Sequence, residues 1–295
     1  MDIKSKIADL QCFLTVIDTG SFSSAAALLD MQVAKVSRGV SRLESSLNVT
    51  LFNRTTRRIE LTAEGRTFAR YARESLNILA QGEDELISLQ GTPKGNLRID
   101  AVSPFLFHQI VPHIQAFQAH YPDINLSLIS NENIIDLIEK KTDVAIRVGQ
   151  LSDSNLHAKK LGLSKLHIVA SPEYLAKNGV PKHIGELTEH QLIGFADNPK
   201  LNQWYVGDNT PMVPDICASN GETLRQLALN GNGIALLSHF MIKQDLQQGQ
   251  LVEVLAGSVQ SPNPREEVNA VYYKHSAISS RISAFLDFFA ARINL

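Results

Sequence analysis

The chain of 295 residues is 44% hydrophobic and 20% charged, and its formal net charge is only −2. This composition is typical of an ordinary globular protein, and the length allows two or three domains with separate cores. Residues 1–10 lack the apolar stretch of a signal peptide, and no run approaches the roughly 20 apolar residues that span a membrane. We therefore expect a cytoplasmic protein that does not insert into membranes. Its two cysteines, Cys12 and Cys217, are predicted to be buried thiols and not a disulfide.

Two short helices with a tight break between them are predicted near the N-terminus. Small residues indicate a helix over 23–29, and a second helix is predicted over 33–47. Apolar residues recur along the second helix with the spacing of one buried face. They are Val36, Val40, Leu43 and Leu47. The opposite face carries small and basic residues: Ala34, Lys35, Arg38, Ser41 and Arg42. This arrangement is typical of a helix-turn-helix, although two ordinary core helices would give the same spacing.

A basic loop lies between two short extended runs directly after these helices. Residues 50–52 and 59–61 are the extended runs, and residues 53–58 between them predict a β-wing. Between positions 35 and 73 nine basic residues stand against three acidic ones. A solvated helix face usually mixes both signs, so this clustering favours a surface that faces phosphates.

The order of residues in this stretch resembles the winged helix-turn-helix of LysR-type transcriptional regulators. The matching residues are Phe13, Gly20, Ser21, Phe22, Ala25, Ala26, Leu28, Leu29, Val36, Ser37, Arg38, Leu43, Glu44, Leu51, Phe52, Arg54, Leu61, Thr62, Glu64 and Gly65. Val33 departs from the family pattern, because it stands where a base-contacting Gln is usual. DNA binding is still expected, and this departure bears on the preferred base sequence.

The resemblance implies a binding surface for double-stranded promoter DNA on the second helix and the wing. From the helix, the residues expected to face the major groove or a phosphate are Ala34, Lys35, Ser37, Arg38 and Arg42. From the wing, Arg54, Arg57 and Arg58 are expected to contact phosphates or the adjacent minor groove. The resemblance also implies a homodimer or homotetramer that bends promoter DNA, and contact with RNA polymerase if the protein is an activator.

A long helix is predicted after the wing, from a cap at Thr62 to about residue 90. Its mostly apolar stripe recurs at steps of three and four, through Phe68, Tyr71, Ala72, Leu76, Leu79, Glu83, Leu86 and Gln90. A helix of this length beside a small domain cannot bury the whole stripe. We therefore expect it to pair with the same helix of a second chain, the alternative being that it packs only on its own domain.

Strands alternate with helices beyond the break at residues 91–95, which predicts a mainly parallel sheet with helices on both faces. The residues alone allow one large domain or two small ones. The resemblance implies two lobes similar to periplasmic binding proteins, with a hinge near residues 167–168 and 270–271. The predicted fold is thus α+β and multi-domain, and its parts span 1–62 (winged helix-turn-helix), 63–91 (linker helix) and 92–295 (effector domain). Lobe I is expected over 95–166 and 272–295, and lobe II over 167–271.

Ligands in open α/β sheets gather at the carboxyl ends of strands, near helix N-termini. The polar residues predicted there are Ser103, Ser130, Ser219 and Asn220. They suit a small anionic effector such as a carboxylate, although plain helix capping would use the same residue types. Arg147 and Gly149 are weaker candidates, and Arg147 pairs either with an anionic effector or with Asp143.

Residue patterns of catalysis and metal binding are missing from the sequence. The nine histidines are scattered without HExxH spacing, and there is no GxSxG elbow and no P-loop. We therefore expect no enzyme, no metal and no cofactor. The favoured hypothesis is a ligand-responsive transcription factor. The alternative is a small-molecule binding protein or an enzyme built on the α/β region, with an N-terminal domain that serves oligomerisation.

Overall fold

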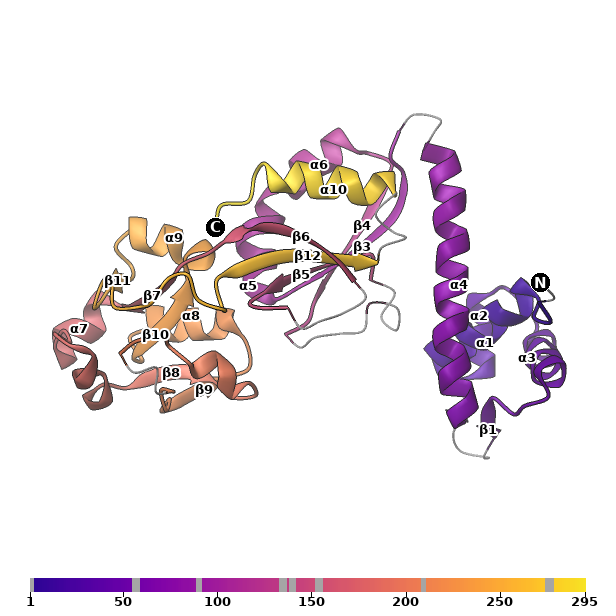
Figure 1. The fold of residues 1–295 in the computed structure, drawn as a ribbon, viewed down its shortest axis with the longest axis horizontal. Helices are drawn as coiled ribbons and strands as arrows, with labels where there is room; N and C mark the ends of the chain where they lie inside the picture. The colour runs from indigo at the N-terminus through magenta and orange to yellow at the C-terminus, as the bar shows by residue number, and fades with distance from the viewer. Residues whose placement is uncertain are drawn as a thin grey trace. The chain divides into compact units, whose positions relative to one another are not determined.

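The structure is a computed structural model, and it describes residues 3–54, 59–88, 92–132, 137, 142–151, 156–207, 211–273 and 279–295. The chain forms two compact units, Met1–Asp84 and Glu85–Leu295, which are treated separately below (Figure 1). Among the described residues no helix is long and apolar enough to cross a membrane.

The first unit packs three helices against a two-stranded wing and the start of a long helix. Its elements are α1 (Ile7–Thr19), α2 (Phe22–Leu28), α3 (Val33–Leu47), β1 (Phe52–Arg54), β2 (Ile59–Leu61) and α4 (Ala63–Ser88). The second predicted helix is confirmed over 33–47, while the first strand of the wing begins two residues later than expected. Phe13 is fully buried at the centre of the core, with its ring 5.3 Å from that of Phe52 and 6.0 Å from that of Phe68.

The second unit contains two five-stranded sheets. One sheet has the order β4-β3-β5-β12-β6, and the other has the order β11-β7-β10-β8-β9. The strands of the first are β3 (Gly95–Ala101), β4 (Ile124–Ser130), β5 (Val144–Val148), β6 (Leu156–Leu163) and β12 (Glu267–Tyr273). Those of the second are β7 (Leu166–Ala170), β8 (Leu192–Phe195), β9 (Ile216–Ala218), β10 (Ile234–Ser238) and β11 (Val252–Glu253).

Each sheet is mixed, which corrects the prediction of a mainly parallel sheet. β3, β4 and β5 run parallel, but β12 pairs antiparallel with both β5 and β6. In the other sheet β8, β9 and β10 run parallel, while β7 pairs antiparallel with both β10 and β11. The antiparallel pairs arise where the chain passes from one sheet to the other and returns.

The two crossings lie outside the positions expected for the hinge. The first is at Ser164 and Lys165, between β6 and β7, and the second spans residues 254–266, between β11 and β12. Residues 167–168 are instead inside β7, and residues 270–271 are inside β12. All of β12 therefore belongs to the first sheet, so the first lobe resumes at about residue 267 and not at 272. The run of apolar residues in β12 indicated a strand but could not indicate its partner.

Helices and short turns cover both sheets. They are α5 (Ser103–Phe105), η1 (Leu106–Ile110), η2 (Val111–His113), α6 (Ile114–His120), α7 (Pro172–Asn178), η3 (Ile184–Glu189), η4 (Pro199–Asn202), α8 (Gly221–Leu229), α9 (His239–Gln247) and α10 (Ser280–Ala290). One apolar core runs under both sheets, and Phe105 and Phe240 meet in it with ring centroids 5.4 Å apart. The sequence pattern also predicts a helix over 134–139, which lies almost wholly outside the described residues, while β6, β8 and α9 were not predicted.

Candidate DNA-binding and effector sites

The helix α3 buries one face and leaves a small, basic face open. Its buried residues are Val36, Gly39, Val40 and Leu43. Four of the predicted DNA-contacting residues lie on the other side, where Ala34, Lys35 and Arg38 are exposed and Ser37 is half-buried. Arg38 Nε donates to the carbonyl of Ala34 at 3.2 Å, which keeps its guanidinium near the N-terminal end of the helix. The open face therefore presents two cations beside small residues that admit a close approach.

Arg42, the fifth residue of α3 predicted to contact DNA, differs from the other four because it forms an ion pair with α1. Its Nη2 and Nε donate to the two carboxylate oxygens of Asp9 in α1, at 2.5 and 3.2 Å. The Asp9 side chain is only 6% exposed, so the ion pair joins α1 to the side of α3. A Cβ added at Gly39 would lie 3.1 Å from Cys12 Sγ and 3.2 Å from Asp9 Oδ1, which shows how closely the two helices approach.

Two side chains, Glu44 and Thr62, fix the wing to α3 and to α4. Both are among the residues that match the family in sequence, and the structure shows their hydrogen bonds. Glu44 Oε1 of α3 accepts from the backbone N–H groups of Leu51 and Phe52, at 2.8 and 3.3 Å. Thr62 Oγ1 accepts from the N–H of Gly65 at 2.8 Å and so caps α4 as predicted, while it also donates to the carbonyl of Thr50. The Arg54 side chain and all of Arg57 and Arg58 lie outside the described residues.

The turn between α2 and α3 leaves the first residues of α3 at the surface. Ser21 caps α2 by accepting from the N–H of Ser24 at 3.0 Å, and Asp30 adopts φ 51° in the turn that follows. Val33, the residue that departs from the family pattern, is 45% exposed at the first position of α3. An apolar side chain at this place offers methyl groups and no hydrogen bond.

Ser103 and Ser130 lie at the carboxyl ends of β3 and β4, as the sequence predicted, and their side chains meet there. Their hydroxyl oxygens are 2.8 Å apart. Glu132 Oε1 accepts from both the backbone N–H and the hydroxyl of Ser103, at 3.0 and 2.5 Å. The donors expected to receive an anion are therefore already bonded to a carboxylate of the chain.

Arg147 forms its ion pair with Asp100 and not with Asp143. Its Nη1 lies 3.0 Å from Asp100 Oδ1, and the Arg147 and Asp100 side chains are 11% and 0% exposed. Asp143 instead accepts from the N–H of Arg98 at 2.8 Å and lies 3.5 Å from Nη2 of Arg281. Burial raises the pKa of Asp143 to about 6. Arg147 Nη2 is buried without a hydrogen-bond partner in the described chain, so this arginine keeps a donor available.

The remaining predicted effector residues have local roles. Asn220 caps α8 by accepting from the N–H of Thr223 at 2.9 Å, and Ser219 is exposed beside it. Gly149 adopts φ 101° and donates its N–H to the carbonyl of Glu267 at 2.7 Å. These are the capping and turn roles that the sequence left open as the alternative.

The contacts between α8 and the segment formed by α5 and η1 could not be predicted from the sequence. A Cβ at Gly221, the first residue of α8, would lie 3.0 Å from the Pro104 ring of α5. Close by, His108 Nε2 lies 2.8 Å from Glu222 Oε2, and Glu222 also binds Arg225. Helix capping signals at Asn220 mark the start of α8 but give no indication of the partner across the lobes.

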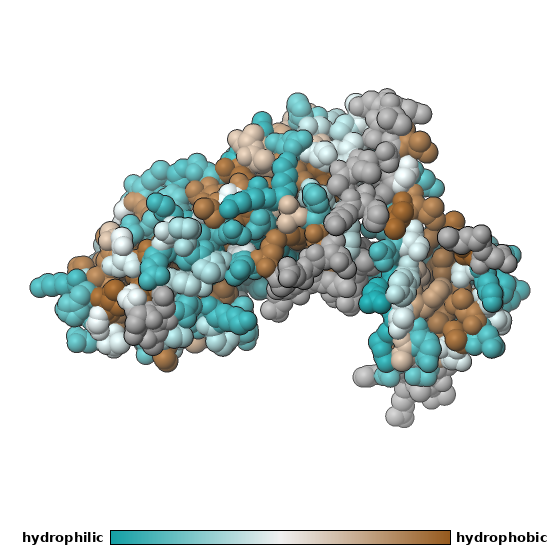
Figure 2. All heavy atoms as spheres, in the orientation of Figure 1, coloured by the Kyte–Doolittle hydropathy of each residue, from teal (hydrophilic) through white to brown (hydrophobic). Residues whose placement is uncertain are grey.

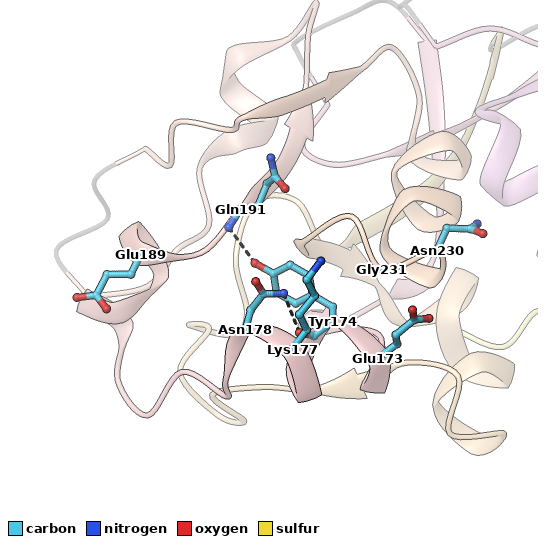
Figure 3. Close-up of a pocket in the computed structure, with 8 residues that line it drawn as sticks. All are labelled: Glu173, Tyr174, Lys177, Asn178, Glu189, Gln191, Asn230 and Gly231. Carbon is cyan, nitrogen blue, oxygen red and sulfur yellow. Dashed lines mark hydrogen bonds between the residues drawn. The ribbon is translucent and has the colours of Figure 1, made fainter.

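A polar hollow of about 380 Å³ lies on the second lobe, apart from the predicted effector residues (Figure 3). Tyr174 lies across its floor, and its hydroxyl accepts from the Gln191 N–H at 2.9 Å while Asn178 donates to its carbonyl at 2.9 Å. Glu173, Glu189 and Lys177 put both signs of charge around the rim. Two hydrogen bonds thus join lining residues to one another, and the lining shows no single charge or apolar face to a ligand.

The cysteine and metal predictions have different outcomes. Cys12 is buried as expected, but Cys217 is exposed in β9, which corrects that half of the prediction. Burial raises the pKa of the Cys12 thiol. Within the described residues no group of three His, Cys, Asp or Glu side chains could hold a metal ion.

Comparison with known proteins identifies both units. Residues 7–66 match the bacterial regulatory helix-turn-helix of the lysR family, and residues 90–294 match the LysR substrate binding domain. The transcriptional regulator CrgA of Neisseria meningitidis serogroup C is 43% identical over 290 residues, which cover 97% of this chain and 96% of CrgA. The regulator DmlR of Escherichia coli is 33% identical over 95% of this chain and 92% of its own length.

Solved structures agree with this assignment. The structure of CrgA from Neisseria meningitidis, a LysR-type transcriptional regulator, matches with a TM-score of 0.66 and 41% identity, over 98% of this chain and 99% of that one. The full-length virulence activator AphB of Vibrio cholerae matches with a TM-score of 0.61 and 30% identity, over 98% of this chain and 100% of AphB. Regulators of this family bind DNA and small-molecule effectors and form oligomers. The chain therefore belongs to the LysR family, and it is a transcriptional regulator with a DNA-binding helix-turn-helix and an effector-binding domain.

Proposed function

We propose that α3 enters the major groove of promoter DNA and contacts it through Ala34, Lys35, Ser37 and Arg38. The observation that carries this proposal is the open face of α3, on which Lys35 and Arg38 are exposed while the reverse face is buried against α1. Arg54, Arg57 and Arg58 of the wing contact phosphates or the adjacent minor groove. Arg42 contributes mainly through Asp9, by holding α3 at a fixed angle to α1. Two such helices on a homodimer contact half-sites about 34 Å apart.

We infer that α4 supplies the contact between the two chains. Figure 2 shows hydrophobic side chains at the surface of the upper part of α4 as oriented in Figure 1. Tyr71, Ile78, Leu79 and Leu86 are 42–66% exposed in the single chain. Tyr71 and Leu86 lie seven or eight positions from the adjacent pair Ile78 and Leu79, a spacing at which two helices bury a shared stripe. A homodimer, or a homotetramer of two dimers, would remove this stripe from water.

We propose further that a small anionic effector binds where the parallel strands of the two lobes end. The buried Arg147 Nη2 near the end of β5, which has no hydrogen-bond partner among the described residues, supports this place. An effector that binds one arrangement of the lobes more tightly would shift the spacing of the DNA-binding helices. The protein would act in the cytoplasm, without catalysis, and would contact RNA polymerase if it is an activator.

Binding to DNA across a range of salt tests the main proposal. Promoter fragments are selected from the host genome with the full-length protein, and affinity for the selected fragment is measured by fluorescence anisotropy. Six or more phosphate contacts would lower the affinity by about a thousandfold or more between 50 and 200 mM salt. A salt-independent affinity, or the absence of any selected fragment, would contradict the proposal and favour a binding protein that uses its first unit for oligomerisation.

A further inference from the structure

Arg265 belongs to the second crossing between the sheets, and its side chain reaches the end of β8. Its Nη1 donates to the carbonyls of Leu201 and Gln203, at 2.5 and 3.3 Å. The guanidinium carbon lies 5.9 Å from the ring centroid of Phe195, the last residue of β8. Phe195 is paired with Ala218 at the end of the parallel neighbour β9. The Arg265 side chain therefore lies at the carboxyl edge of the second lobe's parallel strands.

The backbone around Arg265 runs along the corresponding edge of the first lobe. The Glu267 carbonyl accepts from the N–H of Gly149, directly after β5, at 2.7 Å. A Cβ at Gly149 would lie 3.7 Å from the carbonyl oxygen of Pro264. Arg265 thus has its backbone at the carboxyl end of β5 and its guanidinium at the carboxyl end of β8. Parallel strands of α/β sheets place ligands at these ends.

Among the described residues, the surroundings of Arg265 differ from those of the other enclosed arginines, because no carboxylate pairs with its guanidinium. Arg147 pairs with Asp100, Arg225 with Asp245, and Arg73 with Asp18. Arg265 forms no ion pair within the described part of the chain. Its recorded partners are two carbonyls and an aromatic ring.

The guanidinium remains charged and keeps donors in reserve. Burial lowers the pKa of Arg265 to about 10, with Tyr205 acting in the opposite direction, so the group is still cationic at neutral pH. A guanidinium has five N–H donors arranged as a fork, and Nη1 supplies only two of them. Nε and Nη2 have no recorded partner and are not among the buried unsatisfied atoms, so they reach solvent. A partly desolvated cation without a counter-charge favours a bound oxyanion, which it can contact with two parallel hydrogen bonds.

We propose that Arg265 is the anion receptor of the effector site, and that the effector is a carboxylate whose apolar body packs on Phe195. This inference rests on the proposed function, in which the effector binds at the ends of the parallel strands. The opposite edge supports the same orientation, because Glu132 already occupies the donors of Ser103 with a negative charge. A carboxylate placed there would meet a like charge, whereas at Arg265 it neutralises an unpaired cation.

Binding of matched carboxylates and amides to the full-length protein tests the proposal without DNA. The carboxylates are acetate, benzoate and succinate, and each is compared with its amide: acetamide, benzamide or succinamide. Binding is measured by calorimetry and by the shift of the thermal midpoint, at constant ionic strength. The wild type should bind at least one carboxylate tenfold or more tightly than its amide. Arg265→Gln should remove this preference. Arg292→Gln is the matched control and should keep it, because Arg292 also lies over a phenylalanine ring, 3.7 Å from Phe288, and donates to a carbonyl.

Two results would overturn the inference: a wild type without any preference for the carboxylates, or carboxylate affinities of Arg265→Gln equal to those of the wild type. If Arg265→Gln does not fold, Arg265→Lys decides, since it keeps the charge and loses the fork. Arg265→Lys should lower the affinity for the carboxylates three- to tenfold and leave the affinity for the amides unchanged. An unaltered carboxylate affinity of this variant would contradict the proposal. Operator binding is measured separately, so a failure of DNA binding cannot be mistaken for a failure of the anion receptor.

Discussion

Arg42 in α3 and Asp9 in α1 form a two-point ion pair, with nitrogen–oxygen distances of 2.5 and 3.2 Å. The hydrogen bond that Arg42 donates to Asp9 raises the pKa of Arg42. Because the Asp9 carboxylate is almost fully enclosed while the arginine is more than half exposed, the pair holds α3 at a set angle while leaving part of the guanidinium at the surface. The ion pair therefore positions α3 through Arg42, a residue that the sequence alone predicted to contact DNA.

Removing Arg42 should lower stability more than it changes the preferred operator. Arg42→Ala leaves the enclosed Asp9 carboxylate without its counter-charge, so the thermal midpoint of unfolding should fall. Asp9→Asn, combined with Arg42→Ala, should recover part of that loss because no uncompensated charge remains. Thermal denaturation of the single and double variants checks this. A double variant no more stable than Arg42→Ala would mean that the enclosed charge is not the cause.

Arg38→Ala should weaken operator binding without affecting the fold. Its guanidinium is exposed on α3, and its one recorded hydrogen bond goes to the helix carbonyl of Ala34. We expect a loss of about 1–3 kcal/mol on the specific operator if Arg38 contacts a base. Arg292→Ala removes the same charge from the effector domain and serves as the control. Equal affinities of the two variants in a gel-shift titration would place Arg38 off the DNA-contacting surface.

Gly65→Ala should destabilise the first unit because the wing passes directly over this position. A Cβ there would lie 2.1 Å from the carbonyl oxygen of Leu51, which is backbone and cannot move aside cheaply. We expect a cost of about 1–3 kcal/mol or more in unfolding free energy. Gly82→Ala in the same helix meets nothing within 4 Å and should instead stabilise α4 by up to about 1 kcal/mol. Urea denaturation compares the two, and similar effects of both substitutions would contradict the close approach.

Leu79→Lys should weaken dimerisation if α4 pairs with its counterpart. Leu79 is 52% exposed in one chain, and burying the remaining half of its side chain in both chains of a dimer would contribute about 1.5–3 kcal/mol. Leu28→Lys is the control, since Leu28 is 71% exposed but lies on α2. Light scattering is measured across a dilution series. Leu79→Lys should fall to the monomer mass at concentrations at which the wild type and Leu28→Lys still have the dimer mass. An unchanged mass for Leu79→Lys would show that the dimer contact lies elsewhere.

Asp143 should make stability fall between about pH 4 and pH 6. Burial raises the pKa of its carboxyl in the folded protein to about 6, well above that of an unfolded chain. The folded state therefore binds the proton more tightly, and its advantage is lost as pH rises through 6. Relative to Asp143→Asn, the wild-type unfolding free energy should drop by up to about 3 kcal/mol over this range. Denaturation curves of the wild type and Asp143→Asn at about pH 4 and pH 6 check this. Equal changes in unfolding free energy for the two proteins would show that Asp143 does not titrate in this range.

Elements with a strong local pattern could be predicted within a residue or two. The apolar repeat of Val36, Val40 and Leu43 defines α3, because side chains three or four apart share one face of a helix. The cap at Thr62 marks the start of α4 in the same way. The parallel part of the first sheet also follows from alternating strands and helices. The antiparallel direction of β7 and β12 could not be predicted, because strand direction depends on where the chain crosses between sheets.

The candidate effector site was predicted less completely. The approach of Ser103 to Ser130 follows from two parallel strands ending at one edge, a relation that the strand pattern contains. The carboxylate of Glu132 on those donors does not follow from it, and neither does the choice of Asp100 as the partner of Arg147. Such partners are set by side-chain direction in the folded chain. Arg265 gave no signal at all, since a single arginine in a loop has no periodicity.

The sequence by itself determined the family, the helix-turn-helix and the apolar face of α3, because these depend on residues close together in the chain whose spacing fixes the local backbone and its buried side. Only the tertiary structure decided which charges remain for a ligand. It assigned Arg42 to Asp9, 33 positions away, and gave Arg265 two backbone carbonyls, and no carboxylate, as partners among the described residues. The physical reason is that an ion pair requires approach within a few ångströms, and for residues so far apart that distance is set by how helices and sheets pack.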